Sequence, residues 1–220
     1  MTDRAETDEA AARPGAEPRI EDRRTRLREA LVDHAYQLLS TEGLGAMQAR
    51  RVAQLAGCSV GAIYNVFPDL DELILRGNAR TLLRMKDHER AALAALPADT
   101  PRAERMLALA LAYVDYAFRE ETAWRSLFDY RLTYKKPYPD WYHAIQAEAL
   151  GVLDEALPPP SSPAARETAL RTARTIWAAV HGVVASGLDG RLGARSREEI
   201  EAQIRLLMSL IARGLSLDRT

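Results

Sequence analysis

Cysteine is almost missing from this chain, because Cys58 is the single one among 220 residues. One thiol excludes an internal disulfide and a zinc site built from paired cysteines, and it is typical of a reducing compartment. The four histidines are His34, His88, His143 and His181. They are far apart in sequence, and none has the partner four residues away that a helical zinc motif requires. The sequence therefore predicts no metal site and no cofactor.

Long apolar runs are missing too. No stretch approaches the roughly 18 apolar residues of a membrane-spanning helix. The N-terminal segment MTDRAETDEAAARPGAEP has no apolar core of the kind found in signal peptides. It is acidic and interrupted by Pro14, Gly15 and Pro18, so residues 1–20 are predicted to form a disordered tail. We therefore expect a cytoplasmic protein that does not bind a membrane.

The alternation of apolar and polar residues that marks a β-strand is also absent. Apolar residues instead recur at spacings of three and four, which predicts an all-α fold of about nine helices. These helices are expected at about 21–43, 47–56, 59–66, 68–96, 101–118, 122–133, 139–157, 164–187 and 197–214. Two of the starts carry a capping pair, Asp69 with Glu72 and Ser196 with Glu199.

Positive charge is scarce, since the net charge is −1. Residues 21–86 carry ten basic against eight acidic side chains and are the only net-positive part of the chain. The basic residues gather at Arg23, Arg24, Arg26 and Arg28, and again at Arg50 and Arg51. This balance permits DNA binding without being diagnostic of it.

The segment QARRVAQLAGCSVGAIYNVF at 48–67 has the layout of a helix-turn-helix. A short helix ends at Gly57, and a second short helix is predicted to present Val60, Gly61, Tyr64 and Asn65 outward. Gly61 would let the backbone approach DNA, Tyr64 would bond a phosphate, and Asn65 would offer a donor and an acceptor to a base edge or phosphate. The alternative is an ordinary helical corner, because short helix pairs are common.

The same residues resemble the N-terminal domain of TetR/AcrR-family transcriptional regulators. The run VAQLAGCSVGAIYNVFPDLDELI, preceded by a helix that ends in STEG, carries this resemblance over about residues 22–85. It implies a three-helix DNA-binding domain at 21–85 and a larger helical domain at 86–220 for ligand binding and dimerisation. The DNA-facing residues that it implies are Arg23, Arg24, Thr25, Gln48, Ser59, Val60, Gly61, Tyr64 and Asn65. One departure is Leu70, where the family often places a phosphate-binding lysine.

Aromatic residues make up only 6% of the chain, yet ten of the fourteen lie between Tyr113 and Tyr142. Downstream, WAAVHG at 177–182 resembles the Trp-x-x-x-His-Gly signature of the WHG type of these regulators. The candidate ligand-binding residues are Trp124, Phe128, Arg131, Trp177 and His181. An arginine in such a pocket would favour an anionic or carbonyl-bearing lipophilic ligand. The alternative is that these rings are packed core with a satisfied imidazole.

The last two predicted helices, at about 164–214, carry continuous apolar stripes. The stripes consist of Ile176, Val180, Val183, Val184 and Leu188, then Ile200, Ile204, Leu207, Met208 and Ile211. We expect them to form a homodimer interface, and a two-fold dimer would pair its recognition helices with a palindromic double-stranded operator. The alternative is that both stripes pack within one chain.

An enzyme is disfavoured. Residues 57–61 match G-x-S-x-G, but a nucleophile elbow needs a strand before the serine, and a helix is predicted there. The sequence instead predicts a DNA-binding transcriptional regulator, a repressor released from its operator by a small lipophilic effector. The alternative function is a helical small-molecule binding or carrier protein with a degenerate DNA-binding domain, which Leu70 and the weak basic balance favour.

Overall fold

The computed structural model describes residues 16–132, 137–157, 161–189 and 196–215, with side chains from residue 21. Those residues contain nine α-helices and no strand, so the prediction of an all-α fold is confirmed. The helices are α1 (Ala16–Thr41), α2 (Ala49–Leu55), α3 (Val60–Tyr64), α4 (Leu70–Ala94), α5 (Arg102–Arg119), α6 (Glu121–Asp129), α7 (Asp140–Leu150), α8 (Pro163–Leu188) and α9 (Arg197–Gly214). Two short 3₁₀ helices, η1 (Leu44–Ala46) and η3 (Gly151–Glu155), join them.

Capping side chains set two of the helix starts as predicted. The Asp69 carboxylate accepts a hydrogen bond from the backbone N–H of Glu72 at 2.8 Å. Ser196 and Glu199 form a reciprocal capping box at the start of α9. In both cases the side chain satisfies an amide that has no partner within the first turn of the helix.

Other predicted boundaries were wrong. Helix α1 begins at Ala16, so residues 16–20 belong to a helix and not to a tail. Pro18 is tolerated there because amides of the first helical turn have no intrahelical acceptor. Residues 1–15 of the predicted tail lie outside the described residues. Helix α6 ends at Asp129 instead of residue 133, because Tyr130 has an extended backbone.

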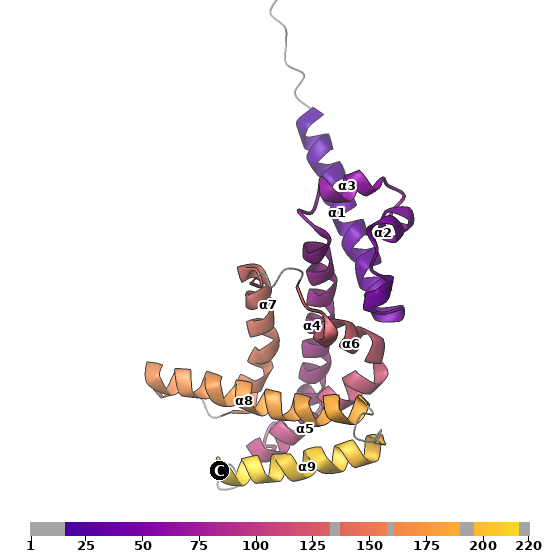
Figure 1. Cartoon of the computed structure of the whole chain (residues 1–220). Helices are drawn as coiled ribbons and strands as arrows, with labels where there is room; N and C mark the ends of the chain where they lie inside the picture. The colour runs from indigo at the N-terminus through magenta and orange to yellow at the C-terminus, as the bar shows by residue number, and fades with distance from the viewer. Residues whose placement is uncertain (1–15, 133–136, 158–160, 190–195, 216–220) are drawn as a thin grey trace, which may run out of the picture.

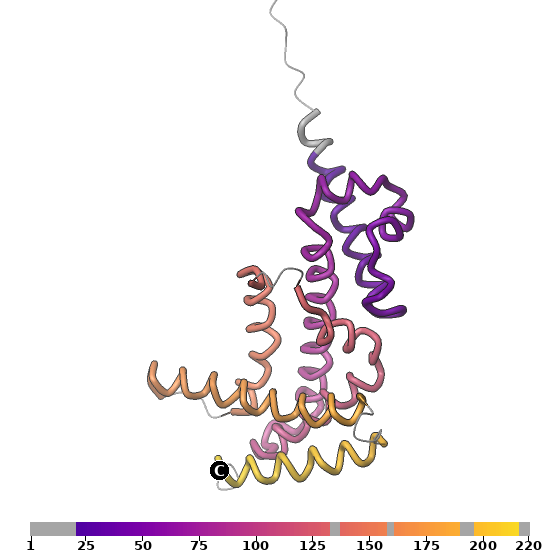
Figure 2. The backbone as a smooth tube through the Cα atoms, viewed as in Figure 1, coloured from indigo at the N-terminus to yellow at the C-terminus, as the bar shows by residue number. Residues whose placement is uncertain are grey.

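Helix α4 connects the two parts of the molecule. Figure 1 shows it running from beside α1 and α3 down among the C-terminal helices, and the backbone trace in Figure 2 follows the same course. It packs on α1 as well as on α5, α6 and α7. The helix is therefore continuous across the predicted domain boundary at residue 85.

The crossing of α1 and α4 is close at Gly77. A Cβ atom at this position would lie 2.6 Å from a methyl carbon of Leu39 and 3.3 Å from the backbone nitrogen of Tyr36. Leu39 is fully buried, so its side chain has no free space to move into. Arg80 adds an ion pair to Asp33 on the same face of α4. A larger residue would have to displace the Leu39 side chain and crowd the backbone of α1.

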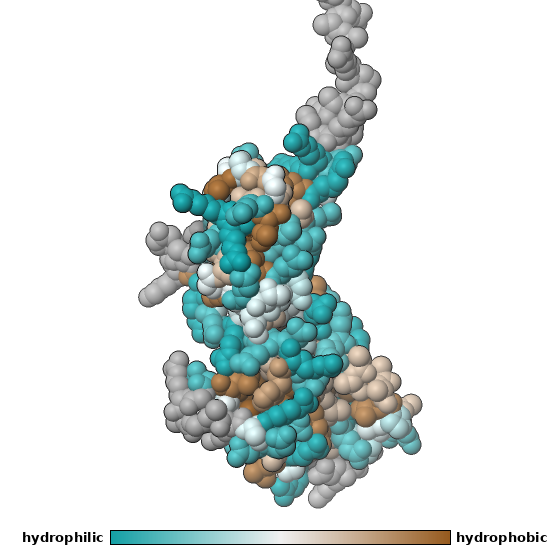
Figure 3. All heavy atoms as spheres, turned by 90° about the vertical axis from the view of Figure 1, so that its right-hand side faces the viewer, coloured by the Kyte–Doolittle hydropathy of each residue, from teal (hydrophilic) through white to brown (hydrophobic). Residues whose placement is uncertain are grey.

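The C-terminal helices form a separate layer. Helices α8 and α9 run antiparallel and lie across the lower end of α4 and α5 in Figure 1. On the face shown in Figure 3, hydrophilic side chains cover much of the surface, and apolar patches lie between them. Within the described residues, no helix combines the length and apolar character needed to cross a bilayer.

We expect Gly77→Ala to destabilise the protein by about 1–3 kcal/mol, because overpacking at the crossing outweighs the higher helix propensity of alanine. Urea unfolding measures this free energy. Gly61→Ala is the matched control, since the nearest atom to its added Cβ would be Ser59 Oγ at 3.9 Å. The control should leave the free energy of unfolding unchanged or slightly higher. Equal effects of the two substitutions would contradict the steric account.

Candidate nucleic-acid interface and internal cavity

Helices α2 and α3 form a corner that is held by a glycine turn, a helix cap and buried side chains. Gly57 has a φ of 62°, a conformation that lets the chain turn sharply between the two helices at little steric cost. Ser59 caps α3, because its Oγ accepts a hydrogen bond from the backbone N–H of Ala62 at 3.2 Å. Val52 and Ile63 are fully buried between the two helices and α1. The outer face of α3 is therefore held in place without using any outward side chain.

That outer face carries several of the predicted DNA-binding residues. Tyr64 is 50% exposed. Gln48, Ser59, Gly61 and Asn65 are exposed as well. The Gln48 side chain makes no capping hydrogen bond at the start of α2. Four of these side chains offer hydrogen-bonding groups to solvent, whereas Gly61 leaves the helix backbone uncovered.

Val60 departs from the prediction that it faces outward. It is half-buried and packs against the apolar core of the N-terminal helices. As the first residue of a helix of only five residues, it lies where the chain re-enters the corner, so part of its side chain is covered. Only the remaining part of Val60 is available to a base or a sugar.

The start of α1 supplies basic side chains beside α3. Arg23, Arg24 and Thr25 are all exposed. The guanidinium of Arg24 donates to the carbonyl oxygen of Asn65 at 3.4 Å, and that of Arg28 donates to the carbonyl oxygen of Val66 at 3.3 Å. These bonds place α1 against the carbonyls that end α3, where a positive charge is favourable.

Sequence reasoning missed the anchoring role of Arg28. Besides its bond to Val66, its guanidinium lies 4.7 Å from the centre of the buried Phe67 ring. Arg51 instead forms an ion pair with the Glu42 carboxylate at 2.6 Å. The basic residues of this region therefore divide into those that brace the fold and those that remain free to meet an anion. Such a division depends on tertiary contacts that spacing along the chain does not reveal.

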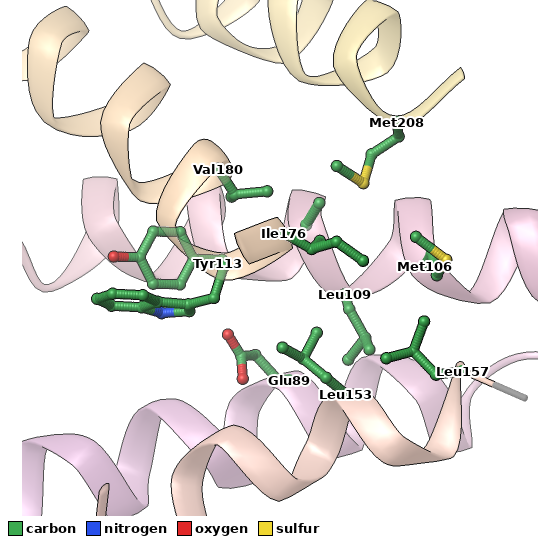
Figure 4. A pocket seen from close by; sticks show the side chains of 11 residues that line it. Glu89, Met106, Leu109, Tyr113, Leu153, Leu157, Ile176, Val180 and Met208 are labelled. Carbon is green, nitrogen blue, oxygen red and sulfur yellow. The ribbon is translucent and has the colours of Figure 1, made fainter. Parts of the chain in front are cut away.

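A small cavity lies within the C-terminal domain, between α4, α5, α8, α9 and η3 (Figure 4). The volume of this cavity is about 30 Å³. Its lining is apolar apart from Glu89 and the Tyr113 and Trp177 side chains; the other lining residues are Met106, Leu109, Ala110, Leu153, Leu157, Ile176, Val180 and Met208. A drug-sized ligand needs roughly 300 Å³ or more, so an effector could enter only if the cavity expanded.

Four of the five predicted ligand-binding residues meet in one aromatic cluster beside this cavity. The rings of Trp177 and His181 are stacked with centroids 5.0 Å apart. Phe128 lies 4.4 Å from His181, and Trp124 lies 5.0 Å from Phe128. Of these four, only Trp177 lines the cavity. Tyr113 belongs to both groups and was missed by the sequence analysis as a lining residue.

Hydrogen bonds within the cluster satisfy the imidazole. The indole N–H of Trp124 donates to the Tyr113 hydroxyl oxygen at 3.0 Å, and this hydroxyl lies 2.7 Å from Nδ1 of His181. The hydrogen bond between the hydroxyl and Nδ1 runs in the direction that the imidazole tautomer sets. Burial lowers the pKa of His181, which favours the neutral ring. Trp124 is buried, in line with the alternative of packed core, whereas His181 is half-buried and Trp177 lines the cavity.

Arg131 is not part of the cavity. Its side chain is exposed, and its guanidinium donates to the carbonyl oxygens of Phe128 at 2.7 Å and Tyr130 at 3.0 Å. Helix α6 ends at Asp129, so Arg131 caps the unpaired carbonyls that follow that end. The argument for an anionic or carbonyl-bearing ligand was based on this arginine and therefore loses its basis.

Comparisons with known proteins match both parts of the chain. Residues 31–76 match the family model described as bacterial regulatory proteins of the tetR family. Residues 106–210 match the model described as tetracyclin repressor-like, C-terminal domain. The chain belongs to the TetR family. It is therefore a DNA-binding transcriptional regulator and not an enzyme.

Solved structures of other regulators share this fold. The regulatory protein SCO4313 is 25% identical, with a TM-score of 0.63 over 86% of this chain and 98% of its own. A TetR-family regulator from Streptomyces coelicolor is 19% identical, with a TM-score of 0.56 over 90% of this chain and 88% of its own. The fatty acid degradation regulator FadR from Bacillus halodurans is 17% identical, with a TM-score of 0.55 over 86% and 96%. No curated protein matches significantly. The WHG subgroup stays a prediction.

Among the described residues that line the cavity of this TetR-family regulator, Glu89 carries the one carboxyl group. Its residue is only 8% exposed, and burial raises the pKa of its carboxyl group to about 8. An acid whose pKa is higher in the folded state than in the unfolded chain holds its proton more tightly when folded. The folded state therefore loses stability relative to the unfolded chain as the pH rises from about the unfolded pKa of 4.5 to about 8.

We expect Glu89→Gln to remove this loss. The free energy of unfolding of the variant minus that of the parent should grow between about pH 5 and about pH 8.5, with a limiting slope near 1.4 kcal/mol per pH unit. Urea unfolding across this range at one protein concentration measures it. Glu104→Gln replaces an exposed glutamate on α5 and should give a difference that stays nearly constant. A constant difference for Glu89→Gln as well would contradict the account.

Proposed function

We propose that this TetR-family regulator is a cytoplasmic, homodimeric repressor that binds a palindromic operator and releases it when a small lipophilic effector enters the C-terminal domain. The observation that carries the DNA-binding part is the outer face of α3. Tyr64 and Asn65 are exposed there, while Ile63 and Val66 beneath them are buried. A short helix held from below, with free polar groups above, has the form needed to enter the major groove.

The proposed roles of the surface residues follow from their positions. Gln48, Ser59, Val60, Gly61, Tyr64 and Asn65 would meet base edges and nearby phosphates, whereas Arg23, Arg24 and Thr25 would meet phosphates from the start of α1. Leu70 at the start of α4 can supply no such phosphate contact. A missing contact lowers the salt dependence of binding by about one unit of slope without abolishing binding.

Helix α6 supports coupling between the cavity and the DNA-binding domain. Its Trp124 and Phe128 belong to the aromatic cluster beside the cavity. On the same short helix, the Ser126 hydroxyl donates to the carbonyl oxygen of Leu39 on α1 at 2.8 Å. The side-chain amide of Asn78 on α4 donates to the Ser126 carbonyl oxygen at 3.3 Å. A displacement of α6 by an effector would therefore act on α1 and α4 together.

The small volume of the cavity also supports this mechanism. Because about 30 Å³ admits little more than water, an effector must push the surrounding helices apart. Packed helices do not deform smoothly, so the displacement is expected to move whole elements. The proposed release of DNA is the result of that movement reaching α1 and α4.

Dimerisation is supported by leucines different from those expected. The predicted stripes of α8 and α9 pack largely within the chain, because Ile176, Val180 and Val184 are buried, as are Ile200 and Ile204. Val183, Leu188, Leu207 and Ile211 of the same stripes are only half-buried, so this part of the stripes remains available to a partner.

The exposed apolar surface of α9 is a better basis for the dimer. Leu206 is 61% exposed and Leu210 is 54% exposed, and they lie one helical turn apart on one face. Leu170 on α8 and Leu215 after α9 are exposed too. Large apolar side chains gathered on neighbouring helices mark interaction surfaces.

The DNA-binding part is tested with the DNA immediately upstream of the coding region of this protein. Fluorescence anisotropy at two salt concentrations, with a scrambled competitor, should show specific binding. Asn65→Ala should weaken it by about 1–3 kcal/mol at the cognate sequence, and Arg23→Ala should lower the salt slope by about one unit. Arg171→Ala, an exposed arginine on α8, is the matched control and should change neither.

If the protein bound genomic fragments only weakly, and if these substitutions left that binding unchanged, the DNA-binding role of α3 would be overturned. The carrier function with a degenerate DNA-binding domain would then account better for the cavity. If specific binding remained unchanged with Asn65→Ala, the base contacts would have to come from other side chains of the corner formed by α2 and α3.

The homodimer is tested by mass in solution. At micromolar concentration we expect twice the chain mass of 24.4 kDa, and Leu210→Glu should shift the protein towards the single chain, because a charge would be buried in the interface. Leu55→Glu is the matched control, since this leucine of α2 is also 47% exposed. It should leave the mass at the dimer value. A single-chain mass for the parent protein would rule out the dimer.

A further inference from the structure

Glu89 is a buried acid, and none of the described residues forms an ion pair with it. It projects from α4 into the cavity, and its carboxylate points towards the side where Tyr113 lies (Figure 4). Burial is the cause of its raised pKa. Burial also raises the pKa of the Tyr113 hydroxyl, and the charge of Glu89 adds to that rise. The neighbouring cations of α4 are engaged elsewhere, because Lys86 pairs with Glu148 at 2.7 Å and Arg90 pairs with Glu155 at 3.2 Å.

Such a residue is costly for the fold. An ionised carboxylate in an apolar interior loses several kcal/mol of hydration. A leucine or methionine would fill the same space without this cost. Buried acids that stability does not explain are candidates for ligand recognition.

The surroundings of Glu89 define the ligand that it suits. The Tyr113 hydroxyl already accepts a hydrogen bond from Trp124 and lies 2.7 Å from Nδ1 of His181. Among the described residues that line the cavity there is no lysine, arginine or histidine. An anion placed there would be repelled by ionised Glu89, and the indole N–H of Trp177 and the protonated form of Glu89 could donate to it only as neutral groups. A cation would instead meet a carboxylate together with the aromatic rings of Tyr113 and Trp177, whose faces attract positive charge.

We propose that Glu89 anchors the positively charged nitrogen of the effector, which is a small lipophilic amine or ammonium ion. This inference rests on the proposed function, in which the cavity is the effector site. The apolar body of the ligand packs against the opposite end of the cavity, where Met106 and Met208 lie (Figure 4). Methionine side chains are flexible, so they can adapt to the ligand as the surrounding helices move apart.

The proposal is tested with matched small probes on the full chain. The benzyltrimethylammonium ion carries a permanent charge, neopentylbenzene is its uncharged isostere, and 3-phenylpropionate carries the opposite charge. Isothermal titration should show that the ammonium ion binds at least roughly ten-fold more tightly than either of the others, because a charge-assisted contact and cation–π attraction are lost with them.

The decisive variant is Glu89→Gln. It should weaken binding of the ammonium ion by at least roughly ten-fold and leave neopentylbenzene unchanged. Trp177→Leu should also weaken the ammonium ion more than the isostere. Glu104→Gln, an exposed acid outside the cavity, should change neither affinity. Circular dichroism and cooperative melting confirm that the variants are folded. Unchanged ammonium affinity in folded Glu89→Gln, or tighter binding of 3-phenylpropionate than of the ammonium ion, would overturn the proposal.

Failure of this proposal can be told apart from failure of the proposed function. Anisotropy with operator DNA is measured separately, with and without each probe. An ammonium ion that binds through Glu89 without releasing DNA would support the site and overturn the effector role of the cavity. DNA that is released by an uncharged or anionic compound, with no binding of the ammonium ion, would support the regulator and overturn the role of Glu89.

Discussion

The packing of α1 against α4 at Gly77 is the contact on which the rest of the molecule depends. The missing side chain allows the backbone of α4 to lie close to Tyr36 and Leu39 of α1. Because α2 packs on α1, and α3 packs on α2, the orientation of the recognition surface is fixed through this contact. The far half of α4 carries Glu89 into the cavity. One helix therefore bears the DNA-binding unit at one end and the candidate anchor for an effector at the other.

Local features of the fold could be predicted from the sequence, because they depend on residues near each other in the chain. Asp69 and Ser196 mark helix starts by capping their own first turns, and the corner at Gly57 follows from one glycine. Boundaries governed by distant packing were less accurate, as at the end of α6. Arg131 was misplaced for the same reason, since its carbonyl partners became available only when α6 ended early.

The cavity shows most clearly where sequence reasoning stops. Some of the aromatic residues from Tyr113 onwards meet in one cluster, but their spacing in the sequence could not tell which ring faces open space. Glu89 gave no signal at all, because one acid in a long amphipathic helix is normally on the solvated face. Its chemical meaning comes from α5, α8 and α9 closing around it, which is a property of the tertiary structure alone.

The length of α4 has a mechanical consequence. Its 25 residues correspond to a stiff rod of about 37 Å at about 1.5 Å per residue. A tilt of about 5° at the cavity end would move the opposite end by about 3 Å, which is close to the rise of about 3.4 Å per base pair in DNA. In a two-fold assembly the two recognition helices would move symmetrically, so the distance between them would change. A ligand no larger than a few atoms could thus put both half-sites out of register at once.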